Sequence, residues 1–101
     1  MTEAQKNIFR NAIADVKKAG YSIRDGGFGT NRRCCPVRAI YIANNTDDVS
    51  YVEAAHKLLK CSYEDVWSFI YGFDGSAFAG WPDDTSFYDF GKELRLSEIL
   101  Q

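Results

Sequence analysis

The stretch SYVEAAHKLLKCSYEDVWSFIYG, residues 50–72, decides the fold, because it predicts two helices separated by a short break. Ser50 and Glu53 have the spacing of a capping box, which predicts a first helix over residues 51–60. Ser62 lies after the break and is a preferred residue for capping a second helix. A helical hairpin is therefore the centre from which the rest of the chain is arranged.

The second of these helices is apolar on more than one side. Its large apolar residues are Val66, Trp67, Phe69 and Ile70. A helix that is apolar all round is usually buried. We therefore expect this helix, which ends at Gly72, to lie at the centre of the protein.

The N-terminal segment predicts another helix, from Thr2 to Ala19. Thr2 and Gln5 have capping-box spacing, and Gly20 follows as a helix C-cap. The apolar residues at helical spacing are Ile8, Phe9, Ala12, Ile13 and Val16. One face of this helix should therefore pack on the core.

Between these helices the pattern is less regular. Residues 21–33 predict a loop with a short extended piece at residues 21–23. Pro36 suits the first turn of a short helix, with Cys35 near the cap position. The Val and Ile residues that follow in 37–42 also suit a strand, although Pro36 favours the helix.

After Gly72 the sequence predicts a long loop over residues 73–85. Ser86 would cap a short helix over residues 87–94, and residues 96–100 could add one more turn. We expect a mainly α-helical protein, a compact single-domain bundle of four to six short helices over residues 1–101, with room for one short strand pair.

Charge is almost balanced overall, with 12 Lys and Arg against 14 Asp and Glu. This balance argues against a general nucleic-acid coat and against a polybasic membrane binder. The two parts of the chain differ, because residues 1–43 carry eight basic and three acidic residues, whereas residues 44–101 carry four and eleven. No apolar run approaches a membrane span and the N-terminus has no signal-peptide core, so we expect a cytoplasmic protein without membrane contact.

Residues 54–70 resemble a helix-turn-helix DNA-binding unit in their two alanines, their leucines and the turn that ends in Ser62. The resemblance has two departures. Lys60 stands where such turns often have glycine, and Glu64 and Asp65 would face the anionic DNA groove. A plain helical hairpin is therefore the preferred interpretation.

Three further motifs resemble small bacterial and phage proteins of uncharacterised function. They are the Cys35-Pro36 stretch, the helix with Ala54-Ala55, and the turn Gly72-Phe73-Asp74-Gly75. The resemblance implies a compact, α-rich fold and implies no activity.

Chemistry-bearing motifs are scarce, and the sequence has none of the common catalytic or nucleotide-binding signatures. Cys34, Cys35, His56 and Cys61 would need the fold to bring them together before they could hold zinc or act as a Cys–His pair. We expect the cysteines to pack as small hydrophobic residues instead, and we expect no metal, no cofactor and no catalysis.

Arginines gather in and beside a glycine-containing loop, and they are Arg24, Arg32, Arg33 and Arg38. Such a cluster binds phosphates or carboxylates through paired N–H groups. The preferred alternative is that these arginines form ion pairs with acids of the same chain. Asp25 is the only acid among them.

Residues 63–90 hold ten of the fifteen aromatic residues, six acids and no lysine or arginine. A loop cannot easily bury all of these rings, and exposed aromatic patches often mark protein interfaces. The candidate partner-binding residues are Phe73, Phe78, Trp81, Asp83, Asp84 and Tyr88.

The leading hypothesis is a small, non-enzymatic module that binds a protein partner or a second copy of itself through this aromatic and acidic surface. The alternative is a nucleic-acid or phosphate binder that uses the basic N-terminal part and the arginine loop. A third hypothesis is an acidic surface that mimics nucleic acid.

Overall fold

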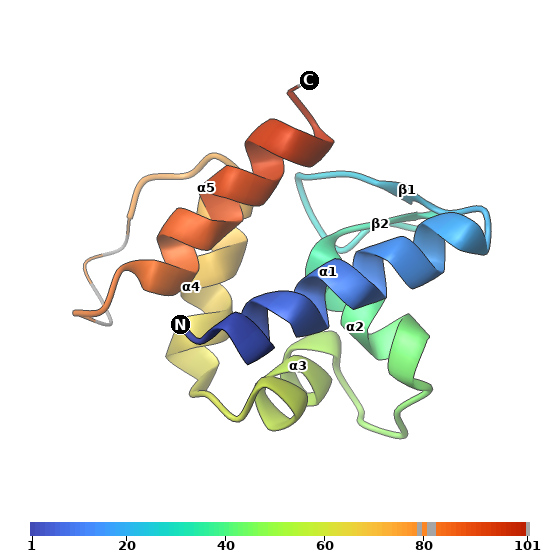
Figure 1. Ribbon diagram of the computed structural model, residues 1–101, viewed down its shortest axis with the longest axis horizontal. Coiled ribbons are helices and arrows are strands. Elements are labelled where there is room, and N and C mark those ends of the chain that lie inside the picture. Colours follow the sequence, from blue (N-terminus) through green and yellow to red (C-terminus); the bar gives the residue numbers. More distant parts are fainter. Residues whose placement is uncertain (79, 81–82, 101) are drawn as a thin grey trace.

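Five α-helices and one pair of short strands follow one another along the residues that the structure describes (Figure 1). The structure is a computed structural model, and it describes residues 1–78, 80 and 83–100. In chain order the elements are α1 (Glu3–Lys18), β1 (Ser22–Ile23), β2 (Arg33–Cys34), α2 (Pro36–Asn44), α3 (Tyr51–Leu59), α4 (Tyr63–Phe73) and α5 (Ser86–Glu98). The predicted mainly α-helical class is confirmed.

Three helix starts follow the predicted capping residues. Thr2 and Ser62 each accept a hydrogen bond from the backbone N–H three residues later, and each forms a complete capping box. Ser50 Oγ accepts from the N–H of Glu53 at 3.0 Å. These bonds satisfy N–H groups that have no partner within the helix, so α1, α3 and α4 begin where local chemistry predicts.

The start of α5 differs from the prediction, because Ser86 is its first residue and not its cap. Asp84 Oδ1 accepts from the Ser86 N–H at 2.9 Å, whereas the Ser86 hydroxyl accepts from the N-terminal ammonium of Met1 at 2.8 Å. The helix also runs four residues beyond the predicted end at Leu94, to Glu98. A contact between the chain terminus and α5 therefore replaces the expected cap.

The region before α2 contains more order than a loop. β1 and β2 form a parallel pair with Ser22 opposite Arg33 and Ile23 opposite Cys34. α2 is helical rather than extended, with Pro36 in its first turn and Cys35 as the N-cap residue. The short extended piece predicted at residues 21–23 and the helix favoured after Pro36 are thus both present.

One hydrophobic core draws on all five helices. Phe9 of α1 is fully buried and stacks on Phe69 of α4, with ring centroids 4.1 Å apart. Phe90 of α5 lies 5.9 Å from the Phe9 ring. The predicted central position of the helix over residues 63–72 is therefore confirmed.

α4 packs chiefly against α5, and the two helices run side by side in Figure 1. A Cβ atom added at Gly72 would lie 2.1 Å from the carbonyl oxygen of Tyr88, and one at Gly91 would lie 2.4 Å from that of Phe69. Only glycine fits these two positions without a shift of backbone. The close approach brings Phe69 and Phe73 onto the face of α5.

In Figure 1 the strand pair lies on the right, next to α1 and α2, whereas α4 and α5 lie on the left. Within the described part of the chain, no helix has the length and apolar character needed to cross a bilayer.

Candidate functional site

One of the predicted partner-binding residues, Phe73, is buried. Phe73 is only 1% exposed, because it is the last residue of α4 and not part of the following loop. It packs beside Phe69 in the core. Including Phe73 in a docking surface was therefore wrong.

The other predicted residues of this segment are partly used within the chain. Phe78 and Tyr88 are half-buried and pack on each other at 5.2 Å, and the Tyr88 hydroxyl donates to the Ser76 carbonyl at 2.7 Å. Asp83 is exposed, and Asp84 is exposed but binds the start of α5. Trp81 lies outside the described residues.

A second aromatic surface lies between the β1–β2 loop, α2, the α2–α3 loop, α3 and α4. We call it the aromatic groove. Its lining residues are Phe28, Tyr41, Val49, Ser50, Tyr51, Val52, Tyr63 and Trp67. They surround an open hollow of about 630 Å³. Val49, Tyr63 and Trp67 are 94%, 45% and 37% exposed, so large apolar side chains meet solvent here.

The rings of the aromatic groove hold one another in place. Tyr51 makes edge-to-face contacts with Tyr41 and Phe28, with centroids 4.9 and 5.3 Å apart. Phe28 meets the edge of Trp67 at 6.4 Å. Aromatic pairs favour such tilted geometry, so the ring positions do not depend on a ligand.

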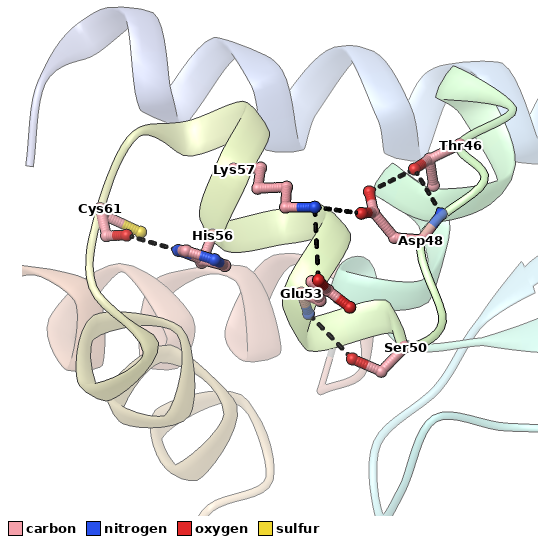
Figure 2. A network of polar contacts seen from close by, with 7 residues as sticks. All are labelled: Thr46, Asp48, Ser50, Glu53, His56, Lys57 and Cys61. Atoms are coloured by element: carbon pink, nitrogen blue, oxygen red, sulfur yellow. Dashed lines mark hydrogen bonds and ion pairs between the residues drawn. The ribbon is translucent and has the colours of Figure 1, made fainter.

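A network of polar contacts fixes the rim of the aromatic groove (Figure 2). Lys57 Nζ lies 2.6 Å from Asp48 Oδ1, and Asp48 also binds Thr46, which ties the α2–α3 loop to α3. His56 Nδ1 lies 3.1 Å from the carbonyl oxygen of Cys61, and its ring stacks on Tyr63 at 4.2 Å. The network therefore positions both Val49, next to Asp48, and Tyr63.

A smaller apolar pocket adjoins the aromatic groove and shares Phe28 and Trp67 with it. Its volume is about 100 Å³. The other lining residues are Gly27, Cys35, Pro36, Val37, Phe69, Ile70, Phe73 and Asp74. One apolar side chain of a ligand is the kind of group that this space suits.

Asp74 lies at the mouth of this pocket. Burial raises the pKa of its carboxyl group above the ordinary value. Its Oδ1 accepts from the Gly26 N–H at 3.1 Å, and the neighbouring Asp25 pairs with Arg95 of α5. The first contact attaches the glycine loop that carries Phe28 to the end of α4, and the second attaches it to α5.

The sequence prediction missed the aromatic groove, although one signal for it was present. Tyr63 and Trp67 are four residues apart and so lie on one side of α4, opposite Phe69. The apolar character on more than one side of α4 predicted a central helix, but it did not show which side is covered. One side is buried, and the other lines the groove.

The four predicted anion-binding arginines have two different roles. Arg24, Arg32 and Arg33 line an open depression of about 380 Å³ together with Thr30 and Asn31, and we call this site the arginine hollow. Arg38 is not among its lining residues, because its guanidinium donates to the backbone carbonyls of Arg33 and Asn31.

No carboxylate among the described residues forms an ion pair with any of the four arginines. Asp25 pairs with Arg95 instead. The preferred expectation, that these arginines pair with acids of the same chain, was therefore wrong for the part of the chain that the structure describes.

The cysteines do not form a reactive centre. Cys34 and Cys35 are buried in the core, as expected for small hydrophobic residues. Burial raises the pKa of Cys35 to about 11 and that of Cys61 to about 12, so these thiols stay protonated at neutral pH. Across the described residues, no group of three or more His, Cys, Asp or Glu is placed to hold a metal ion.

α3 and α4 are joined by a tight turn in which Lys60 adopts the left-handed conformation, with φ of 56°. The first turn of α4 presents the exposed acid Glu64, and Asp65 binds the Ser62 N–H. These acids remain an argument against DNA in the major groove.

No protein family, curated protein or solved structure compared with this chain matches it.

Proposed function

We propose that this chain is a small, non-enzymatic interaction module that takes a short apolar segment of a partner protein into the aromatic groove. The observation that carries the proposal is the set of exposed apolar side chains Val49, Tyr63 and Trp67 around one hollow. Tyr and Trp are enriched among the residues that dominate protein–protein binding energy. These exposed side chains support an interaction surface that includes α4 rather than the segment after it.

The size of the aromatic groove favours a short segment over a second copy of the chain. Its volume of about 630 Å³ lies in the range of small-ligand sites, although the hollow is open to solvent. A stable dimer buries a broad surface of roughly 800 Å² on each partner. The adjoining pocket of about 100 Å³ adds a place for one apolar anchor side chain.

The rigidity of the groove supports binding as well. Phe28 contacts both Tyr51 and Trp67, and the Lys57–Asp48 pair links the loop that carries Val49 to α3. A surface that is already ordered loses less conformational entropy when a ligand binds. The groove is therefore suited to a short peptide, whose own ordering already costs binding energy.

Selection of a random displayed peptide library on the purified protein tests this function. We expect enrichment of apolar peptides whose affinity falls at least about tenfold in Trp67→Ala and Tyr63→Ala, because these side chains line the groove. The matched control is Leu96→Ala, which removes a 62% exposed apolar side chain on α5, outside the groove.

Three results would contradict the proposal. The first is a selection that enriches no peptide, and the second is a peptide that binds Trp67→Ala as tightly as the native chain. The third is a concentration-dependent dimer in sedimentation that Trp67→Ala abolishes, because it would assign the groove to a second copy.

A further inference from the structure

The arginine hollow is a second open site, which the proposed function does not use. Arg33 of the hollow lies in β2, and Arg24 directly follows β1. Cys34 is fully buried and lies opposite Ile23, so the neighbouring residues Arg33 and Arg24 fall on the outer side of the pleat. Both arginines are exposed, and both line the hollow.

The turn that leads into β2 is held in one shape. Gly29 has φ of 93°, and a Cβ atom there would lie 2.0 Å from the Arg33 carbonyl oxygen. Asn31 also has positive φ, and the Arg33 N–H donates to the Thr30 carbonyl at 3.0 Å. The Arg38 guanidinium stabilises the turn by donating to the backbone carbonyls of Asn31 and Arg33, at 3.3 and 2.9 Å.

The guanidinium groups of the hollow keep most of their N–H donors available. Arg33 has no side-chain hydrogen bond or ion pair with any described residue, and Arg24 uses only Nε, toward the Asp25 carbonyl. Arg32 donates one N–H to the Ala19 carbonyl at 2.6 Å and lies over the Tyr21 ring. None of the three guanidinium groups forms an ion pair with a described acid, and like charges repel one another, so an anion would relieve that repulsion.

We propose that the arginine hollow binds a phosphoryl group. A phosphoryl group offers several acceptor oxygens and up to two negative charges, and guanidinium groups bind such oxygens through two parallel N–H bonds. Thr30 and Asn31 add a neutral hydroxyl and an amide at the same depression. The shape is set before binding, because Gly29 and Arg38 fix the turn.

Two sources supply this chemistry, a small phosphorylated molecule and the backbone of a single-stranded nucleic acid. Inorganic pyrophosphate and a short single-stranded oligothymidylate are the two probes, each titrated by calorimetry at constant ionic strength. The test variant is the double substitution Arg24→Gln and Arg33→Gln, which removes exposed guanidinium groups that have no acidic partner. The control is Arg10→Gln, an exposed arginine on α1 that pairs with Glu3 at 2.8 Å.

We expect the double glutamine variant to lose at least about tenfold in affinity for the probe that binds, whereas Arg10→Gln changes it less than about twofold. Pyrophosphate should also raise the Tm of the native chain and of Arg10→Gln but not of the double variant. The double variant Arg24→Lys and Arg33→Lys should bind with intermediate affinity. It keeps the positive charges, but a lysine cannot donate two parallel N–H bonds to a phosphoryl group.

Each outcome bears on the proposal. Loss of pyrophosphate binding alone assigns the site to a small phosphorylated ligand, and loss of oligothymidylate binding assigns it to a nucleic-acid backbone. Absence of binding by either probe overturns the proposal. Equal binding by native, glutamine and lysine forms also overturns it, because non-specific attraction would then explain the data.

Discussion

The two faces of α4 use the same kinds of residue for opposite purposes. One face carries Phe69, Gly72 and Phe73, which are buried against α1 and α5. The other face carries Tyr63 and Trp67, which are 45% and 37% exposed in the aromatic groove. Below we call them the core face and the groove face.

The difference shows that aromatic content does not by itself separate stability from binding. A ring on the core face has neighbours on every side, so its removal leaves a cavity. A ring on the groove face has neighbours on one side only, and its open side remains available to a ligand. Four substitutions test this separation.

The largest expected effect is on the core face. Phe73→Ala should lower the free energy of unfolding by about 3–5 kcal/mol, whereas Trp67→Ala should cost about 1 kcal/mol despite removing a larger side chain. Urea denaturation measures both. Phe73→Leu, with a loss of about 1 kcal/mol, keeps the comparison measurable if the alanine variant does not fold. A greater loss in Trp67→Ala than in Phe73→Ala would contradict the assignment of the two faces.

The next effect concerns the α4–α5 contact. Gly72→Ala normally favours a helix, but here its Cβ would meet the Tyr88 carbonyl, so we expect a loss of about 1–3 kcal/mol. The free energy of unfolding from chemical denaturation provides the measurement. A gain in stability would mean that α4 and α5 are far enough apart for a Cβ atom at position 72 to avoid the Tyr88 carbonyl oxygen.

A smaller effect is expected at the start of α4, where the cap residue Ser62 belongs to neither face. Ser62→Ala removes the hydroxyl that accepts the Asp65 N–H at 3.1 Å and should cost about 1 kcal/mol of folding stability. Ser50→Ala, the equivalent change at α3, is the matched control. A thermal melt in which Ser62→Ala matches the native chain would show that packing alone starts α4.

The smallest effect lies at the end of α4, where Asp74 follows both faces. Its pKa is raised in the folded state, mainly by burial, so the folded chain binds more protons than the unfolded chain between the two pKa values. Stability therefore falls as pH rises from the unfolded value, about 3.9, through the higher folded value, and it stays lower above that point.

Asp74→Asn removes this penalty and keeps an oxygen for the Gly26 N–H. We expect this variant to stabilise the protein at neutral pH by less than about 1 kcal/mol. Part of the gain comes from removing a negative charge at the C-terminus of α4, where the helix dipole disfavours it. Melting curves from acid to neutral pH compare the two forms. A native chain whose stability rises relative to Asp74→Asn over that range would reverse the sign and refute the prediction.

Much of the helical structure was predictable because its signals are local. The side chains of Thr2, Ser50 and Ser62 each accept a hydrogen bond from an N–H three residues later. Their capping effect therefore depends only on residues close in sequence. The role of Ser86 at the start of α5 was not predicted in this way, since Ser86 binds the terminal ammonium of Met1, which is 85 residues away in sequence. No local pattern predicts that contact.

The candidate sites divide in the same way. The sequence pointed to Arg24, Arg32, Arg33 and Arg38 as a group, since they lie within fifteen positions of one another. It could not show that Asp25 pairs with Arg95, and that contact leaves the arginines without an acidic partner. Nor could it show that Phe28 meets Trp67 across the aromatic groove.

By itself, then, the sequence determined the mainly helical class and the starts of four helices, α1 to α4. Tertiary structure alone decided which face of α4 is covered, where Asp25 finds its partner and which aromatic rings meet solvent. The physical reason is range. Caps and helical periodicity act over three or four residues, whereas exposure depends on what distant segments leave uncovered.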